Sequence, residues 1–216
     1  MLERMDDFFT ARVDGYDEHM KSNIQGAASF YKYTASLLPA EKQANVLDLG
    51  CGTGLELEEY FSINPYARVT GIDLTEAMLE SLKAKFPDKE ITTICGSYFE
   101  VPFGEELFDA AVSVESLHHF SKEEKIQMYI RLRKALKPGG YFILTDYFAD
   151  LDEQETLYRQ ELQQIRKEQE LPDDVFFHYD TPLTVEHEKE ALLAAGFAQV
   201  EELGNWGVTH TLKAIK

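Results

Sequence analysis

Short apolar runs alternate with stretches of helical periodicity along most of the chain. Five runs have the length and the β-branched or aromatic content of buried strands; they lie at residues 44–50, 67–74, 90–95, 108–114 and 141–148. Helical patterns lie between them, at residues 54–61, 75–86 and 121–137. Strands that alternate with helices in this way predict an α/β fold with a mainly parallel sheet.

Local signals place the ends of two of these helices. Thr75 is the expected N-cap of the helix over 75–86. Ser121 and Glu124 have the spacing of a capping box, so the later helix is predicted to start there. It is expected to end before Pro138, because the Pro138-Gly139 pair suits the centre of a type II turn.

The last part of the chain departs from the alternation. A helix over 184–196, closed by Gly196, is followed by two predicted strands within residues 198–216. A tight turn between Gly204 and Gly207 would join these strands. This hairpin predicts an antiparallel element that closes an otherwise parallel sheet.

The chain is predicted to form a single domain over residues 1–216, because 216 residues with 44% hydrophobic content build one sizeable core. Two segments fall outside the regular alternation. Residues 1 to about 40 are expected to form a helical cap docked across the sheet, and residues of about 150–180 a helical insertion.

The chain shows no signal for a membrane or for secretion. No run approaches the ~18 apolar residues of a membrane span, and the first residues carry acids without an apolar core of a signal peptide. Cys51 and Cys95 have no CxxC partner and cannot build a disulfide framework, so both are expected to be reduced thiols. We therefore expect a cytoplasmic protein without a membrane partner.

The formal net charge of −18 argues against nucleic acid as a substrate, because such a charge repels a phosphate backbone. A local basic patch would counter this argument. The basic run at 131–137 has helical spacing, however, and is expected to be a solvated helix face.

Candidate chemistry begins at the segment VLDLGCGTGLE, residues 46–56, where an apolar run leads into Gly50, Gly52 and Gly54 and then a helix. Glycines at alternate positions let the backbone turn tightly and approach a ligand. Asp73 ends the next predicted strand, where a carboxylate can accept hydrogen bonds from both hydroxyls of a ribose. The alternative for Asp73 is a capping role beside Thr75.

A nicotinamide dehydrogenase is the chief rival for such a loop. Its fingerprint is G-x-G-x-x-G, whereas the glycines here follow G-x-G-x-G and no Tyr-x-x-x-Lys pair follows the fourth predicted strand. The spacing therefore disfavours that class.

Four segments in order, VLDLGCGTG, GIDLTEAML, FDAAVSVESLHHF and LKPGGYFILTD, resemble the class I S-adenosylmethionine (SAM)-dependent methyltransferases. The resemblance covers residues of roughly 40–216. It implies a doubly wound, Rossmann-like sheet of seven strands in the order 3-2-1-4-5-7-6, with strand 7 antiparallel. The predicted closing hairpin agrees with this arrangement.

The resemblance also implies SAM as the cofactor and assigns residues to it. Asp48 and the loop from Gly50 to Gly54 would hold the methionine part, Asp73 the ribose, and Leu74 the adenine. Many members carry an acid where this chain has Ser97, so Ser97, Tyr98 or the backbone is expected to replace that contact. The full implied set is Asp48, Gly50, Cys51, Gly52, Gly54, Asp73, Leu74, Ser97, Tyr98, Val114 and His119.

The acceptor side is expected above the carboxyl ends of the fourth and fifth strands. Candidates for catalysis are His119, Tyr16 and Asp146, and further candidates for the acceptor wall are Glu115, His118, His19, Tyr147, Phe176, Phe177, His178 and Tyr179. The aromatic run at 176–179 is predicted either to form part of a lid or to pack onto the domain. A lid made from the cap and the insertion would favour a small molecule over a polymer.

The adjacent histidines, His118 and His119, raise the question of a metal. Neighbouring side chains on a helix or strand point in different directions, so one ion is not expected to take both. Asp146 could serve a magnesium site, but no second Asp stands at the end of the fourth strand. The sequence therefore predicts no metal. His119 is expected to line the pocket, either touching the acceptor or shaping the wall behind the cofactor, and His118 to pack or face solvent.

Two functions stay open at this point. The first is a methyltransferase acting on a small molecule, and the second is a SAM-binding protein without catalysis. The glycine loop and Asp73 serve both functions equally. The oligomeric state is open as well.

Overall fold

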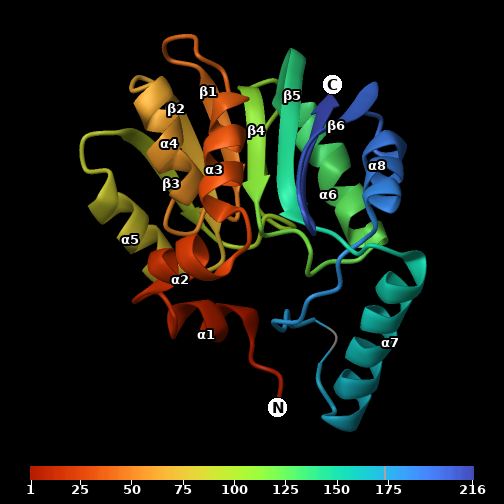
Figure 1. The fold of residues 1–216 in the computed structure, drawn as a ribbon. Coiled ribbons are helices and arrows are strands. Elements are labelled where there is room, and N and C mark those ends of the chain that lie inside the picture. Colours follow the sequence, from red (N-terminus) through yellow and green to blue (C-terminus); the bar gives the residue numbers. More distant parts are fainter. Residues whose placement is uncertain (173) are drawn as a thin grey trace.

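The computed structural model describes residues 1–172 and 174–216, so position 173 of the predicted insertion lies outside the described residues. Helices and strands alternate as expected (Figure 1). The elements are α1 (Met5–Thr10), α2 (Tyr16–Asn23), α3 (Ala27–Ser36), β1 (Asn45–Leu49), α4 (Leu55–Ile63), β2 (Arg68–Asp73), α5 (Glu76–Lys85), β3 (Glu90–Cys95), β4 (Phe108–Val114), α6 (Lys122–Ala135), β5 (Leu136–Tyr147), α7 (Asp152–Glu168), α8 (Val185–Ala194), β6 (Gln199–Trp206) and β7 (Thr209–Ile215).

The sheet has seven strands in the order β3-β2-β1-β4-β5-β7-β6, which confirms the order implied by the resemblance. The pairs from β3 to β5 are parallel, and β7 runs antiparallel to both β5 and β6. The carboxyl ends of β4 and β5 point toward α1 and α2 (Figure 1). Parallel strands that end at one edge bring their following loops together, and that edge holds the candidate site.

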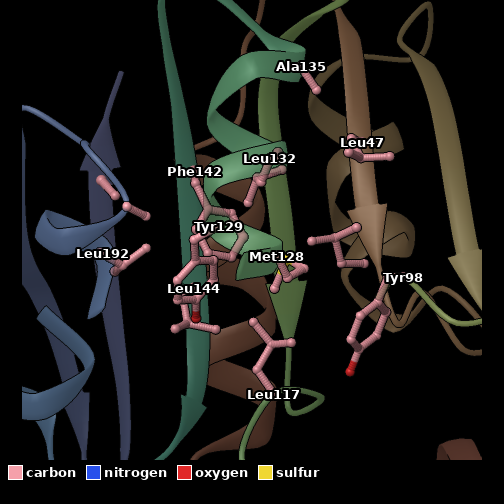
Figure 2. Packing of buried hydrophobic residues seen from close by; sticks show 14 of the residues in the cluster. Leu47, Tyr98, Leu117, Met128, Tyr129, Leu132, Ala135, Phe142, Leu144 and Leu192 are labelled. Carbon is pink, nitrogen blue, oxygen red and sulfur yellow. The ribbon is translucent and has the colours of Figure 1, made fainter. Parts of the chain in front are cut away.

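Helices cover both faces of the sheet. Alternate strand residues point to opposite faces, so each face presents apolar side chains that pack against helices. On one face Val46, Val112 and Ile143 pack with α3 and α4. On the other face Phe142 packs with α6 and α8, as Figure 2 shows for Leu132 of α6 and Leu192 of α8. Burial of each apolar side chain of this kind contributes about 1.5–3 kcal/mol to the stability of the folded state. The two cores hold the strand tips in place.

Two predicted turns differ from the structure. The helix that starts at Ser121 has its capping box and ends at Ala135, before Pro138 as predicted, but the chain then enters β5 directly, so Pro138 and Gly139 lie inside this strand. Gly139 keeps the expected positive φ, of 77°, at an irregularity in the β4–β5 ladder. The hairpin turn lies at Gly207, since Gly204 is inside β6. These differences depend on which residues the neighbouring strand pairs with, and a local pattern does not contain that information.

Thr75 precedes α5 as predicted, but its side chain makes no capping bond. The Oδ1 atom of Asp73 instead accepts from the Thr75 N–H at 2.9 Å. The backbone of the helix start is therefore held by Asp73.

The cap and the insertion meet over this edge of the sheet. The Met5 N–H donates to the Phe176 carbonyl at 3.0 Å, and the His178 N–H donates to the Glu3 carbonyl at 3.0 Å. Helix α7 projects from the body (Figure 1) and is tied down by its buried Glu155. The Oε2 atom of Glu155 accepts from the Thr184 N–H at 2.9 Å, at the start of α8. The two predicted extra segments thus form one cover.

Among the described residues, no helix combines the length and the apolar character that crossing a membrane requires.

Candidate functional site

The loop after β1 contains the three glycines that the sequence singled out. Gly50, Gly52 and Gly54 all have positive φ, of 73°, 47° and 75°. Gly50 also lies against the loop after β4, because a Cβ added there would be 2.0 Å from the Ser116 Oγ. Other side chains would strain the backbone here by about 1–2 kcal/mol per residue. The loop therefore exposes backbone where a ligand can approach closely.

Asp73, at the tip of β2, is bonded to this loop. Its Oδ2 atom accepts from the Gly52 N–H at 2.9 Å, and its Oδ1 atom accepts from the Thr75 N–H. Burial raises the pKa of Asp73, although these N–H groups oppose the rise. The capping alternative is thus present in the structure, and it leaves further lone pairs of the carboxylate for a ligand.

Two more carboxylates are buried beneath the loop. The Asp48 side chain is buried and neither of its oxygens has a hydrogen-bond partner among the described residues; the same holds for Oε1 of Glu56. Burial and the neighbouring Glu56 raise the pKa of Asp48 well above its ordinary value, and burial raises that of Glu56. The raised pKa values favour the protonated, uncharged forms of these two acids.

A cavity opens between the glycine loop, the tip of β2 and the loop after β4, which is where ligands bind at the carboxyl ends of parallel strands. The walls are formed by Met5, Phe9, Tyr16, Gly50, Gly52, Asp73, Leu74, Met78, Gly96, Ser97, Tyr98, Val114, Glu115, Ser116, His119, Phe120 and Phe176.

The structure brings together most of the residues predicted to contact a cofactor. Three of them lie outside the cavity wall: Asp48, Cys51 and Gly54. Cys51 is buried under β2, since a Cβ on Gly71 would be 2.7 Å from its Sγ. Gly54 packs against α5. Cys51 and Gly54 thus pack the glycine loop against β2 and α5.

Tyr98 lines the cavity with its ring while its hydroxyl donates to the Ser116 carbonyl at 3.0 Å. The hydroxyl is therefore occupied within the protein. The Ser97 Oγ atom accepts from the Phe99 N–H at 3.2 Å. Both residues stand at the predicted place at the end of β3.

A second, larger cavity adjoins the first. The two cavities share four wall residues: Phe9, Tyr16, Glu115 and His119. The second cavity also has His118, His178, Asp180, Tyr147, His19 and Phe8 in its wall. Phe8 and His19 come from the cap, and His178 and Asp180 come from the segment after α7.

His118 and His119 lie side by side, with ring centroids 4.1 Å apart. The prediction that their rings point apart is wrong. It assumed a helix or a strand, whereas residues 115–121 form a turn between β4 and α6. Both rings are buried, and His118 does not face solvent.

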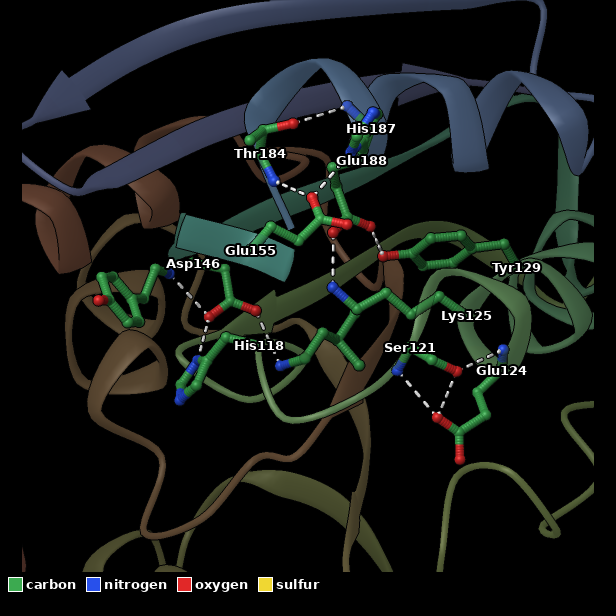
Figure 3. A network of polar contacts seen from close by, with 12 residues as sticks. His118, Ser121, Glu124, Lys125, Tyr129, Asp146, Glu155, Thr184, His187 and Glu188 are labelled. Carbon is green, nitrogen blue, oxygen red and sulfur yellow. Dashed lines mark hydrogen bonds and ion pairs between the residues drawn. The ribbon is translucent and has the colours of Figure 1, made fainter. Parts of the chain in front are cut away.

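Asp146 lies behind His118, in neither cavity wall. Its Oδ1 atom is 2.6 Å from Nδ1 of His118, and its Oδ2 atom accepts from the Leu117 N–H at 2.8 Å (Figure 3). Burial alone would lower the pKa of His118, but the Asp146 and Asp180 carboxylates raise it to about 9. For His119, burial and the charge of His118 lower the pKa. Asp146 therefore acts on His118 and not directly on a ligand.

Glu115 stands at the wall shared by both cavities. Its φ is 49°, an unusual value outside glycine, and its N–H donates to the Thr145 carbonyl at 2.9 Å. The Thr209 hydroxyl donates to its Oε1 atom at 2.9 Å. Burial and the charge of Asp146 raise the pKa of Glu115 to about 7. Strained residues of this kind gather at functional sites.

The described part of the segment after α7 closes the outer side. The His178 ring stacks on Phe8 with centroids 3.5 Å apart and planes 8° apart. Phe176 contacts Phe120, with centroids 5.4 Å apart. The aromatic run thus does both things that the sequence left open: Phe176 and His178 line the cavities, while Phe177 packs under Arg166, 5.6 Å from its ring centroid.

A family model described as a methyltransferase domain matches residues 46–140, from β1 to the start of β5. This range contains the glycine loop, Asp73 and the loop after β4. The chain belongs to the class I SAM-dependent methyltransferases.

Two relatives and one solved structure show what this methyltransferase chain is similar to. The biotin biosynthesis bifunctional protein BioHC of Teredinibacter turnerae is 30% identical over 72% of this chain and 26% of its own length. The sterol 24-C-methyltransferase ERG6B of Gibberella zeae is 29% identical over 84% of this chain and 46% of its own length. The chain thus spans about a quarter to a half of these relatives.

The structure of Haemonchus contortus phosphoethanolamine N-methyltransferase 2 in complex with SAM has the same fold, with a TM-score of 0.72. It is 17% identical in sequence and the match covers 98% of this chain and 59% of that one. The family's cofactor is SAM.

Several residues of the methyltransferase site were not found from the sequence. Glu56 sits among leucines at the start of α4, and a carboxylate in that apolar run was the available signal. Asp180 follows the aromatic run and carried no signal, because an acid in a loop is ordinarily solvated. Ser116, Phe120 and Met78 reach the cavity through the packing of separate elements.

Proposed function

We propose that this chain binds SAM in the first cavity and transfers its methyl group to a small-molecule acceptor in the second. The observation that carries the proposal is the wall that the two cavities share, formed by Phe9, Tyr16, Glu115 and His119. A methyl group that passes between two molecules needs such a junction.

Methyl transfer from SAM requires of the protein mainly that it positions the two reactants. The methyl of SAM is bound to a positively charged sulfur and is already a good electrophile, so the protein must hold the acceptor in line with it and exclude water. The cover formed by the cap and the segment after α7 supports the exclusion of water.

Roles follow from position. Asp73 is placed for the ribose, and Leu74, Ser97 and Tyr98 lie around the expected adenine. Tyr16, Glu115 and His119 stand where the methyl would pass, and Glu115 is the carboxylate placed to take a proton from an acceptor hydroxyl or amine. Asp146 positions His118.

The cap residues in the wall of the second cavity favour a small molecule over a polymer. Relatives named for sterols and for a tRNA nucleotide show that the family's acceptors vary widely. A polymer would need an open groove, whereas the cap covers this cavity and the net charge of −18 repels nucleic acid.

The test is incubation of the purified protein with methyl-labelled SAM and a small-molecule extract of cells, followed by chromatography of the label. Label in an extract component is expected with the wild type. The Asp73→Ala variant is expected to bind SAM about 1–3 kcal/mol more weakly by calorimetry, because two ribose hydroxyls lose their partner. Asp88→Ala, a surface change of the same type, is the matched control.

Two results would contradict the proposal. Unchanged SAM affinity in Asp73→Ala would remove the ribose role. Tight SAM binding without label in any extract component would favour a SAM-binding protein without catalysis.

A further inference from the structure

The second cavity contains a cluster of three potential metal ligands that cofactor binding does not use. His118, His119 and Asp180 each offer one ligand atom, and these atoms all lie within 4.8 Å of one another. We propose that His118, His119 and Asp180 bind a divalent transition-metal ion, of the Zn²⁺ or Co²⁺ kind, in the wall of the acceptor cavity.

The separations between ligand atoms suit such an ion. The Oδ1 atom of Asp180 is 3.6 Å from Nε2 of His118 and 3.2 Å from Nδ1 of His119. Ligands about 2.1 Å from a tetrahedral ion are about 3.4 Å from one another. All three ligand atoms lie within 4.8 Å of one another, so an ion fits between them once the side chains move closer and Nδ1 of His119 leaves the Tyr179 carbonyl oxygen, which is 3.2 Å away.

The donor types select the class of metal. Two imidazoles and one carboxylate suit Zn²⁺ and its neighbours, whereas Mg²⁺ and Ca²⁺ prefer oxygen ligands throughout. Both histidines bind a metal through a nitrogen lone pair, so each must present an unprotonated ring nitrogen to the ion.

A second carboxylate orients the first histidine. Asp146 holds Nδ1 of His118 at 2.6 Å, which turns Nε2 toward Asp180. The Leu117 and Tyr147 N–H groups fix Asp146 in turn, at 2.8 and 2.9 Å (Figure 3 shows the His118–Asp146 contact). Metal-bound histidines commonly have such a partner behind them, which sets their tautomer and direction.

The neighbouring group of Glu115, His118 and Asp146 also has close ligand atoms. It suits an ion less well, because both oxygens of Asp146 already accept backbone N–H groups. His118 therefore presents its open nitrogen to Asp180.

A metal ion can reach the three ligands from solvent, and they leave part of its coordination shell free. The Asp180 side chain is 49% exposed, while the two rings are buried. All three residues line the second cavity, so the remaining positions of the ion face it. If the proposed function holds, the ion lies where it can anchor an oxygen or nitrogen atom of the acceptor.

The experiment is a titration of the tag-free, chelator-stripped protein with Co²⁺, followed by visible absorption, and then competition with Zn²⁺. One equivalent of Co²⁺ is expected to give the intense absorption of a low-symmetry site. Asp180→Ala is expected to weaken Co²⁺ binding at least tenfold. Asp14→Ala, which removes a carboxylate from the same cavity outside the cluster, is expected to bind Co²⁺ like the wild type.

Calorimetry with SAM on the same samples shows that each variant is folded, and it keeps this test separate from the proposed function. Absence of Co²⁺ binding to the wild type would overturn the metal site, whatever the result for methyl transfer. So would an Asp180→Ala variant that binds SAM and binds Co²⁺ with wild-type affinity. A loss equal in Asp180→Ala and Asp14→Ala would point to general charge and also overturn it.

Discussion

The two cavities of this methyltransferase are built in different ways. The first is formed by strand tips and the loops directly after them, and it is closed by Met5, Phe9 and Tyr16 of the cap and by Phe176 of the segment after α7. The second is formed by side chains from the cap, the turn after β4, the segment after α7 and the β6–β7 turn. The base of the first cavity thus follows from the sheet, whereas the second depends on the docking of separate segments.

This difference predicts different rigidity. The glycine loop is fixed by Asp73, by both cores and by the close contact of Gly50 with Ser116. The cover over the second cavity depends on the Met5 and His178 backbone bonds and on the stack of Phe8 with His178. Regions with few buried contacts open first, and acceptor exchange requires such opening.

The largest expected effect is at the glycine loop. Gly50→Ala places a Cβ 2.0 Å from Ser116 Oγ and 2.6 Å from its Cβ, at a φ of 73°. Backbone strain and the clash together should lower the free energy of unfolding by about 2–5 kcal/mol in urea denaturation.

Gly139→Ala is the matched control for this change. Its φ is 77° but its Cβ would have no neighbour within 4 Å. In Gly139→Ala, backbone strain alone should lower the free energy of unfolding by about 1–2 kcal/mol. Equal losses in both variants would show that contact with the β4 loop is unimportant.

A second prediction concerns the buried acids below the loop. Burial raises the pKa of Glu56 in the folded protein above its ordinary 4.5. The folded state therefore holds this proton more tightly than the unfolded state, so its contribution is present below pH 4.5 and is lost as the pH rises. Glu56→Gln removes this titration and should have a larger free energy of unfolding than the wild type at pH 7.

Urea denaturation at several pH values from 4.5 to 7.5 checks this, with Glu59→Gln on the same helix as the control. A shallower loss of stability with rising pH is expected for Glu56→Gln alone. A slope equal to that of the wild type would mean that Glu56 is not a source of the pH dependence.

The smallest expected effect is at the cover. Phe8→Ala removes the stack on His178, which is worth about 0.5–1.5 kcal/mol. Hydrogen exchange of the Met5 and His178 amides should become about 2- to 12-fold faster. The Gly52 amide, bonded to Asp73, is the internal control and should keep its rate; acceleration at all three amides would mean that the two regions open together.

Much of the first cavity was predictable, because it depends on local rules. The strand before Gly50, the glycine spacing and the acid at the end of the next strand are neighbours along the chain, and a parallel sheet brings such strand ends to one edge. The sheet order required the family resemblance, since periodicity gives strands but not their partners. The start of β5 at Leu136 and the end of β6 at Trp206 were missed, because pairing with β4 and β7 decides them.

The second cavity was only partly predictable. The candidates Tyr16, Glu115, His119 and His178 do meet in it, but the geometry of the histidine pair was mistaken. A turn, unlike a helix or strand, has no fixed side-chain period, so the direction of His118 depends on Asp146 behind it. Asp180 had no pattern of its own.

The sequence by itself determined the alternation of helices and strands, the glycine loop, Asp73 and, through its motifs, the family. These features are encoded by residue type and spacing within short windows. The tertiary structure decided which acids are buried without partners, how the cap meets the segment after α7, and that His118, His119 and Asp180 converge. Those features depend on contacts between residues far apart in the chain, and only packing brings them together.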